Sequence, residues 1–215
     1  MPKHVGAPTY FKEGITLVVS LGFRWLFFSA ILVGLTSAPF YAFAISFLIR
    51  VHGFTTTEAG AAFGLLQGLM GILRILLGGW GFDRCVRSGR GQLLFAPSIV
   101  FFIASFTTLV ALLVQNNWLT VILFVPGMFS FAFLLPWAFG SAHLVAGPGK
   151  QALASSLVQI GSSFVGPTLG PLMVGMVSDA ATAAHHTDGL RWGLLLVPVA
   201  SFLTGLALLH ANNST

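Results

Sequence analysis

The longest uncharged stretch of the chain lies between Arg90 and Lys150, where no Asp, Glu, Lys or Arg occurs. A helix needs about 20 apolar residues to cross a bilayer, so this stretch is long enough for two crossings. The polar pair Asn116-Asn117 separates them. Two crossings return the chain to the side from which it started, so Arg90 and Lys150 are predicted to face the same compartment.

Apolar segments of similar length precede and follow this stretch and raise the prediction to six crossings. The crossings span residues 24–49, 58–81, 93–114, 118–144, 152–177 and 190–210. The connecting loops are short, and the longest is predicted over 178–189. Because only helices and closed barrels satisfy the backbone in lipid, the predicted fold class is an all-α membrane protein with six transmembrane helices. We predict a cytoplasmic or interfacial lead-in over 1–23, the bundle over 24–212 and a cytoplasmic tail over 213–215.

The basic residues are shared unevenly between the two predicted sides. One side carries Lys3, Lys12, Arg24, Arg84, Arg87, Arg90 and Lys150. Arg50 and Arg191 lie in loops on the other side, and Arg74 lies inside a crossing. Cations mark the cytoplasmic side of a membrane protein. We therefore predict a multi-pass protein of the cell membrane with both termini in the cytoplasm.

Residues 9–22, ahead of the first crossing, have a possible apolar stripe with Lys12 and Glu13 opposite it. Two structures fit this pattern. One is an amphipathic helix that lies in the membrane interface, and the other is a simple lead-in to the first crossing.

The composition agrees with a membrane protein. The chain is 56% hydrophobic and 7% charged, against roughly 25% charged in soluble domains, and its mean hydropathy is +0.91. The net charge of +5 does not indicate a nucleic-acid partner, because the cations lie at crossing ends, where they set topology. Cys85 is the single cysteine, so an internal disulfide is excluded. We expect no metal and no cofactor, and we expect membrane lipid as a partner.

A tight turn between the second and third crossings combines one acid with three arginines. It reads Gly78-Gly79-Trp80-Gly81-Phe82-Asp83-Arg84, followed by Cys85-Val86-Arg87-Ser88-Gly89-Arg90. The arginines can anchor at lipid head groups or pair with Asp83, and Asp83 can also meet the positive N-terminal end of another helix. The turn resembles the signature loop of the major facilitator superfamily of secondary transporters, in which glycine, three residues and Asp-Arg precede further basic residues. Upstream glycines lie on one helical stripe: Gly64, Gly68, Gly71 and Gly78.

Three further segments resemble the spinster-type branch of that superfamily. They are Phe47-Leu48-Ile49-Arg50-Val51-His52-Gly53 with Thr57-Glu58-Ala59-Gly60, then Lys150-Gln151-Ala152-Leu153-Ala154, and finally Gly166-Pro167-Thr168-Leu169-Gly170-Pro171-Leu172-Met173-Val174-Gly175 with Ser178-Asp179. The family has twelve crossings in two related halves. The segments resemble parts of its seventh and eleventh crossings, so the chain resembles the C-terminal six-helix half, helices seven to twelve.

The resemblance implies half of a secondary active transporter that moves a small organic or amphipathic solute by alternating access. It implies a cytoplasmic latch made of Gly79, Asp83, Arg84 and Arg87. Because this loop touches the opposite half in the family, the implied partner is a first-half polypeptide or a second copy of the chain. In a homodimer the contact is expected near Gln151. The alternative function is a non-transporting membrane remnant or assembly partner.

Arg74 is the one formal charge well within a predicted crossing, and Gln67 lies two turns earlier on the same face. An intramembrane charge is a functional candidate because its burial in lipid costs several kcal/mol. Two interpretations are open for Arg74. It either contributes to a translocation path or has a structural role, by pairing or by snorkelling toward the interface.

The fifth crossing carries a polar stripe formed by Ser155, Gln159, Ser162, Gly166 and Gly170, with Ser163 at its edge. Such a stripe either allows close helix packing or faces a water-filled cavity. Pro167 and Pro171 remove backbone hydrogen bonds from this crossing, as in the mobile crossings of transporters. We predict that crossings one, two and five line the substrate path. The predicted path residues are Tyr41, Gln67, Arg74, Gln159 and Ser163.

A histidine and a serine lie close in sequence near the end of the fourth crossing, at Ser141 and His143. Residues at i and i+2 of a helix point in different directions, and no acid lies nearby to orient a base. We therefore do not expect an enzyme. No acid lies inside a predicted crossing either, so the sequence identifies no proton relay.

Overall fold

The computed structural model describes residues 7–89, 92–186 and 188–214, with the side chains of 12–89, 92–186 and 188–213. Six helical crossings are present. The first four are α2 (Leu21–His52), α3 (Thr56–Arg87), α4 (Phe95–Leu113) and α5 (Asn117–Ala146). The fifth is one continuous rod made of α6 (Gln151–Ile160), a π-helical turn (Gly161–Val165) and α7 (Gly166–Ala183). The sixth is the pair α8 (Gly189–Leu194) and α9 (Leu196–Ser214). The predicted all-α fold with six crossings is confirmed. Of the residues used to predict orientation, Lys3 and Arg90 lie outside the described part.

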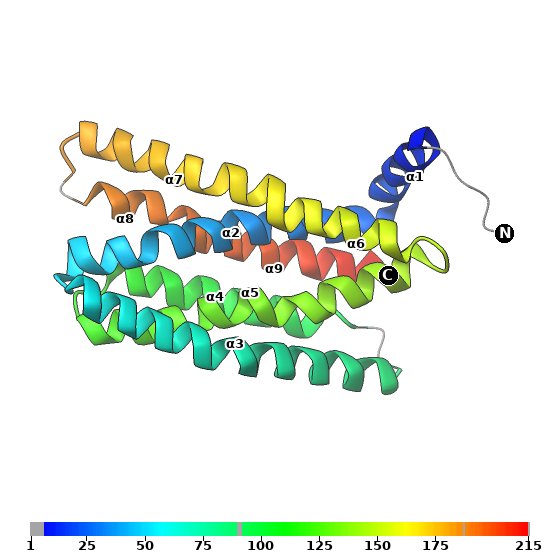
Figure 1. Cartoon of the computed structure of the whole chain (residues 1–215), viewed down its shortest axis with the longest axis horizontal. Helices are drawn as coiled ribbons and strands as arrows, with labels where there is room; N and C mark the ends of the chain where they lie inside the picture. The colour runs from blue at the N-terminus through cyan, green and yellow to red at the C-terminus, as the bar shows by residue number, and fades with distance from the viewer. Residues whose placement is uncertain (1–6, 90–91, 187, 215) are drawn as a thin grey trace.

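Each crossing packs against its neighbours in the bundle in a definite order. Helix α3 contacts α5, α5 contacts α4, α4 contacts α9, α9 contacts α2, and α2 contacts α7. Figure 1 shows α3 along one edge of the bundle and α6–α7 along the other, with the remaining crossings between them. These two outer crossings, α3 and the α6–α7 rod, are called the edge rods below, and the bundle covers each of them on one side only.

Several helices are longer than the predicted crossings. At a rise of 1.5 Å per residue, the 32 residues of α3 extend about 48 Å, against a hydrocarbon core of about 30 Å. Its ends therefore reach the polar layers. Helix α7 continues to Ala183, so the prediction of a loop over 178–189 was wrong for the first part of that range. Helix α9 likewise continues to Ser214, into the predicted tail.

The lead-in contains a separate helix, α1 (Ala7–Val19). Ser20 has extended backbone angles and separates α1 from α2. Leu17 of α1 is buried, whereas Ile15 and Val19 are exposed. Figure 1 shows α1 set at an angle to the bundle. The lead-in is therefore a helix separate from the first crossing, and its location in the membrane interface stays a prediction.

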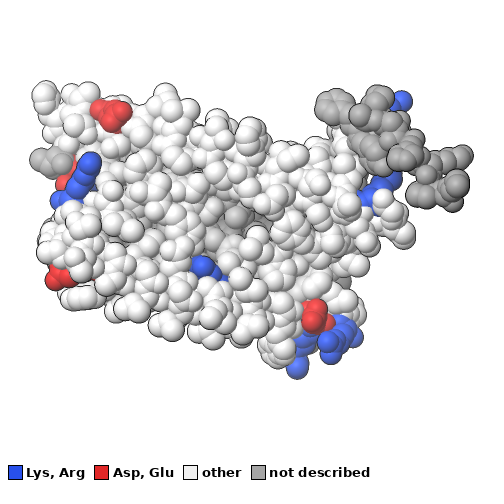
Figure 2. Space-filling model, viewed as in Figure 1, with Lys and Arg blue, Asp and Glu red and all other residues white. Residues whose placement is uncertain are grey.

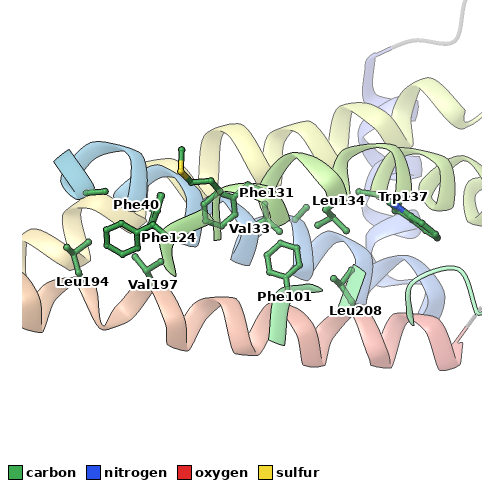
Figure 3. Close-up of a cluster of buried hydrophobic side chains, with 14 of the residues drawn as sticks. Val33, Phe40, Phe101, Phe124, Phe131, Leu134, Trp137, Leu194, Val197 and Leu208 are labelled. Atoms are coloured by element: carbon green, nitrogen blue, oxygen red, sulfur yellow. The ribbon is translucent and has the colours of Figure 1, made fainter. Parts of the chain in front are cut away.

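The core of the bundle is built from aromatic and aliphatic side chains. Phe40 of α2 makes edge-to-face contacts with Phe124 and Phe131 of α5, at ring-centroid distances of 5.1 and 5.6 Å, a geometry that aromatic rings prefer. Figure 3 shows the buried side chains in a row along the bundle, from Leu194 and Phe40 at one end to Trp137 and Leu208 at the other. The row ties α2, α4, α5, α8 and α9 together.

Glycines allow the edge rods to approach the bundle closely. A Cβ atom added at Gly34 of α2 would lie 2.6 Å from Cδ of Pro167 and 2.8 Å from Cα of Gly166. A Cβ atom added at Gly78 of α3 would lie 2.6 Å from the backbone oxygen of Phe133. Small residues at helix interfaces permit this packing in membranes. The two crossings with the fewest buried residues are thus held by backbone-to-backbone contact.

We expect Gly34→Ala to lower the free energy of unfolding by roughly 1–3 kcal/mol, because the added methyl group must push α7 away from α2. Gly64→Ala is the matched control, since a Cβ there meets no atom within 4 Å. Gly64→Ala should leave the free energy of unfolding unchanged or raise it by about 0.5–1 kcal/mol. Thermal unfolding of the purified chain in detergent measures both. Equal stability of the two variants would contradict the close α2–α7 approach.

The charged side chains gather at the two ends of the bundle. One end, here called the basic end, carries Lys12, Arg24, Arg84, Arg87 and Lys150 with the acids Glu13 and Asp83. The opposite end carries Arg50 and Arg191 with Glu58, Asp179 and Asp188. Figure 2 shows this separation on one face of the molecule, with a single blue patch midway between the ends. By the positive-inside rule the basic end is the one predicted to be cytoplasmic.

Candidate functional site

Arg74 lies in the middle of α3 and reaches into the bundle. Its side chain is 8% exposed. Nη1 donates a hydrogen bond to the backbone oxygen of Met128 on α5, at 2.6 Å, and a longer one to the hydroxyl of Tyr41 on α2, at 3.3 Å. The guanidinium group is therefore held between three crossings instead of extending along α3 toward the interface. Of the two structural roles considered for Arg74, this arrangement is pairing and not snorkelling.

The charge of Arg74 is incompletely matched. Both of its partners are neutral oxygens, and its Nε is buried without a hydrogen-bond partner in the described part of the chain. A buried charge without an opposite charge carries a desolvation penalty of several kcal/mol. Arg74 therefore lacks an opposite charge within the described residues.

Gln159 and Ser163 form a second polar pair, on the rod of α6 and α7. Nε2 of Gln159 donates to Oγ of Ser163 at 2.8 Å, and both residues are exposed. Ser163 belongs to the π-helical turn, in which the N–H of Gly166 bonds to the oxygen of Gly161. Pro167 follows directly and has no N–H to donate, which explains why the regular helical pattern is broken here. The sequence predicted the proline effect but not the π turn, a feature common at functional sites.

The five predicted path residues thus come together as two pairs and one single residue. Arg74 pairs with Tyr41, Gln159 pairs with Ser163, and Gln67 is exposed on α3. Tyr41 also makes edge-to-face contacts with Phe63 and Phe131. The aromatic contacts fix the ring whose hydroxyl accepts the hydrogen bond from Arg74.

The residues of the predicted latch lie at the last turns of α3. Asp83, Arg84 and Arg87 are exposed, and Gly79 is half-buried. The guanidinium carbon of Arg84 lies 5.5 Å from the centre of the Trp80 ring, which is a cation–π distance. In the described part of the chain, the one ion pair joins Arg191 to Asp188. Asp83 is therefore not paired with Arg84 or Arg87, whereas its third neighbouring arginine, Arg90, lies outside the described residues.

Two further polar contacts could not be found from the sequence, because their members lie far apart in it. At the end opposite the basic end, the buried His52 hydrogen-bonds through Nδ1 with Oδ1 of Asn117 at 3.2 Å, and Nδ2 of Asn117 donates to the backbone oxygen of His52 at 2.8 Å. At the basic end, Nε2 of His143 lies 2.6 Å from Oγ of Ser155. These contacts join α2 to α5 and α5 to α6. His143 thus pairs with a serine on another helix, while Oγ of Ser141 is buried without a partner in the described residues.

Comparisons with known proteins agree with this architecture. No protein-family model matches the sequence. A curated protein of Mycolicibacterium smegmatis, described as an MFS-type efflux pump, is 29% identical over 164 residues, which are 76% of this chain and 38% of that protein. A crystal structure of a bacterial homologue of the human lysosomal transporter Spinster, inward-facing and unoccupied, matches with a TM-score of 0.71 and 18% identity, over 97% of this chain and 49% of that chain. The chain therefore spans less than half the length of each protein that it matches. These similarities confirm the resemblance that the Gly79–Arg90 turn predicts, and the chain has the fold of one six-helix half of a major facilitator superfamily transporter.

Proposed function

We propose that the chain is one half of a secondary active transporter, which moves a small organic or amphipathic solute by alternating access together with a second six-helix unit. The second unit is either a first-half polypeptide or a second copy of this chain. Two six-helix units rocking about a central site is the general mechanism of such transporters.

The observation that carries this proposal is the lack of cover on the two edge rods. Of the residues in the most hydrophobic part of α3, only 11% are buried, and in the corresponding part of the α6–α7 rod 22% are buried. In the other four crossings this share is 39–56%. Gln67, Gln159 and Ser163 are exposed on these two rods. Polar side chains inside a membrane face a bundle interior or water and not lipid. A second unit that covers α3 and α6–α7 would enclose these residues and leave a polar path between the units.

The incompletely matched charge of Arg74 supports a substrate with an anionic group. An anion bound next to Nε of Arg74 would use the donor that lacks a partner in the described residues, and hydrogen bonds to ionised groups are the stronger ones. Tyr41 would position the guanidinium group and present its hydroxyl to the same ligand. Gln67, Gln159 and Ser163 would contact the uncharged part of the substrate.

The end of α3 would act as the latch between the two units. Gly79 would allow close approach of the second unit, and Asp83, Arg84 and Arg87 would pair with it when the basic end is closed. Asp83 fits the positive N-terminal end of a facing helix. The five acids of this chain lie outside the middle of its crossings, so an acid for proton coupling would come from the second unit.

Flux measurements in liposomes test the proposal. The purified chain is reconstituted alone and together with a co-expressed first-half polypeptide, and uptake of carboxyfluorescein, an anionic dye, is compared with uptake of ethidium, a cationic dye, under an imposed ion gradient. We expect flux of the anionic dye only from samples in which cross-linking detects two six-helix units. Assembled samples without flux of either dye would instead support the alternative of a non-transporting membrane remnant or assembly partner.

A further inference from the structure

A cavity of about 910 Å³ lies at the basic end, apart from the pair formed by Arg74 and Tyr41. Its walls come from the end of α3, the beginning of α4 and the second half of α5. Helices α3 and α4 both pack on α5, and the cavity is the space between them over α5. Its volume is within the range of small-molecule and cofactor sites.

The two ends of this cavity differ in polarity. The part near the basic end is lined by Asp83, Arg84, Arg87 and Ser88. The part farther along the bundle is lined by Leu77, Val100, Phe129 and Phe133. Arg84 and Leu77 are seven residues apart on α3, or about 10 Å along the helix axis. A ligand that fills the cavity therefore needs a polar head and an apolar tail.

The charges at the polar end favour an anionic head group. Two arginines face one acid there, and neither arginine has an ion-pair partner in the described residues. The cation–π contact with Trp80, which also lines the cavity, holds Arg84 at the cavity. Arginine recognises phosphate through paired N–H donors.

Trp137 of α5 adds an independent observation. It lines the cavity, its side chain is 3% exposed, and its Nε1 is buried without a hydrogen-bond partner in the described part of the chain. Figure 3 places Trp137 at the end of the row of core side chains. A buried indole N–H ordinarily finds an acceptor. None is present in the described residues, so this N–H is a donor that an oxygen of a bound ligand would satisfy.

We propose that this cavity binds an anionic phospholipid of the surrounding leaflet, with its phosphate at Arg84 and Arg87 and one acyl chain along Phe129 and Phe133. This goes beyond the proposed transport function, because the lipid is a bound partner and not the transported solute. The phosphate would occupy Arg84 and Arg87 while the basic end is open, and the second six-helix unit would pair with these arginines and with Asp83 when that end is closed.

Lipid titration of the delipidated full chain in detergent, followed by native mass spectrometry, tests this site. We expect phosphatidylglycerol, which is anionic, to bind at least about tenfold more tightly than zwitterionic phosphatidylcholine. The double variant Arg84→Gln/Arg87→Gln should lose this preference. Its matched control, Lys12→Gln/Lys150→Gln, removes the same charge from the same end outside the cavity and should keep the preference.

Two further experiments distinguish a lipid-binding site from a site that binds any anion. Ala96→Trp narrows the cavity without changing its charge, and it should weaken the binding of both lipids. Inorganic phosphate in excess should not displace phosphatidylglycerol, because it has no acyl chain. The proposal is overturned if the double arginine variant keeps its preference, if the lysine control loses it equally, or if inorganic phosphate displaces the lipid completely. Elution volume and helical content of each variant show that its fold is retained.

Discussion

Replacing Arg74 by methionine is expected to reduce flux of an anionic substrate roughly 10- to 100-fold, the effect of losing a hydrogen bond of 1.5–3 kcal/mol to a charged group. At the same time, the melting temperature of the chain should stay the same or rise. Met has a similar length and needs no polar partner, and exchanging a buried, poorly matched charge for an apolar side chain is often neutral or stabilising. The opposite direction of the two effects is specific to a residue that serves the substrate at the expense of stability.

The measurement combines carboxyfluorescein flux in liposomes with thermal unfolding in detergent. Arg50→Gln is the control, because Arg50 is an exposed cation at the end of α2 and takes no part in the hydrogen bonds described for Arg74, Gln159 and their partners. A purely structural role for Arg74 predicts that Arg74→Met lowers the melting temperature by several degrees, with the loss of flux following from unfolding. Unchanged flux with an intact fold would remove Arg74 from the substrate path.

The second large effect is expected at the outer face of α3. The double variant Gly64→Leu/Gly68→Leu should prevent assembly with the second six-helix unit and abolish flux, while the fold of the chain itself is kept. A Cβ atom at Gly64 or Gly68 has open space around it and both glycines are exposed, so a larger side chain can project away from the bundle. Close helix approach at small residues does not survive the addition of large side chains.

Energy transfer between labelled copies in liposomes measures assembly into a homodimer, and co-purification measures assembly with a first-half polypeptide. Ile103→Trp on the exposed face of α4 is the control, since it adds comparable bulk to a crossing that is not an edge rod. We expect this control to assemble normally. Normal assembly of the glycine variant would show that the second unit does not dock on this face of α3.

Much of the fold was predictable because charge and hydropathy respond directly to the bilayer. The uncharged stretch after Arg90, the polar pair Asn116-Asn117 and the short loops predicted the number of crossings and their order, and the structure confirms both. The signature turn around Asp83 and Arg84 identified the family resemblance. Helix ends were less predictable, as α7 shows by running on to Ala183, because alanine-rich polar segments continue a helix as readily as they end one.

The candidate site was only partly predictable. An intramembrane arginine is conspicuous in any sequence, so Arg74 could be identified from its position alone. Its main partner, the backbone oxygen of Met128, is a group that every residue has, and no sequence pattern marks it. The same holds for Trp137, whose unpartnered N–H is a property of its surroundings and not of its residue type.

The sequence by itself determined that this protein lies in a lipid bilayer, how many times it crosses the bilayer and which kind of fold the crossings form. The reason is that the cost of placing charges and backbone groups in lipid depends on residue type and segment length. Only the tertiary structure decided where along its length each helix meets its neighbours. Gly78 packs against the bundle while Gly64 and Gly68 of the same stripe are uncovered, and Arg74 meets Tyr41 while Gln67 on the same face stays exposed. In a membrane, both the lipid-facing and the core-facing sides of a helix are apolar, so hydropathy does not distinguish them and packing against the neighbouring helices does.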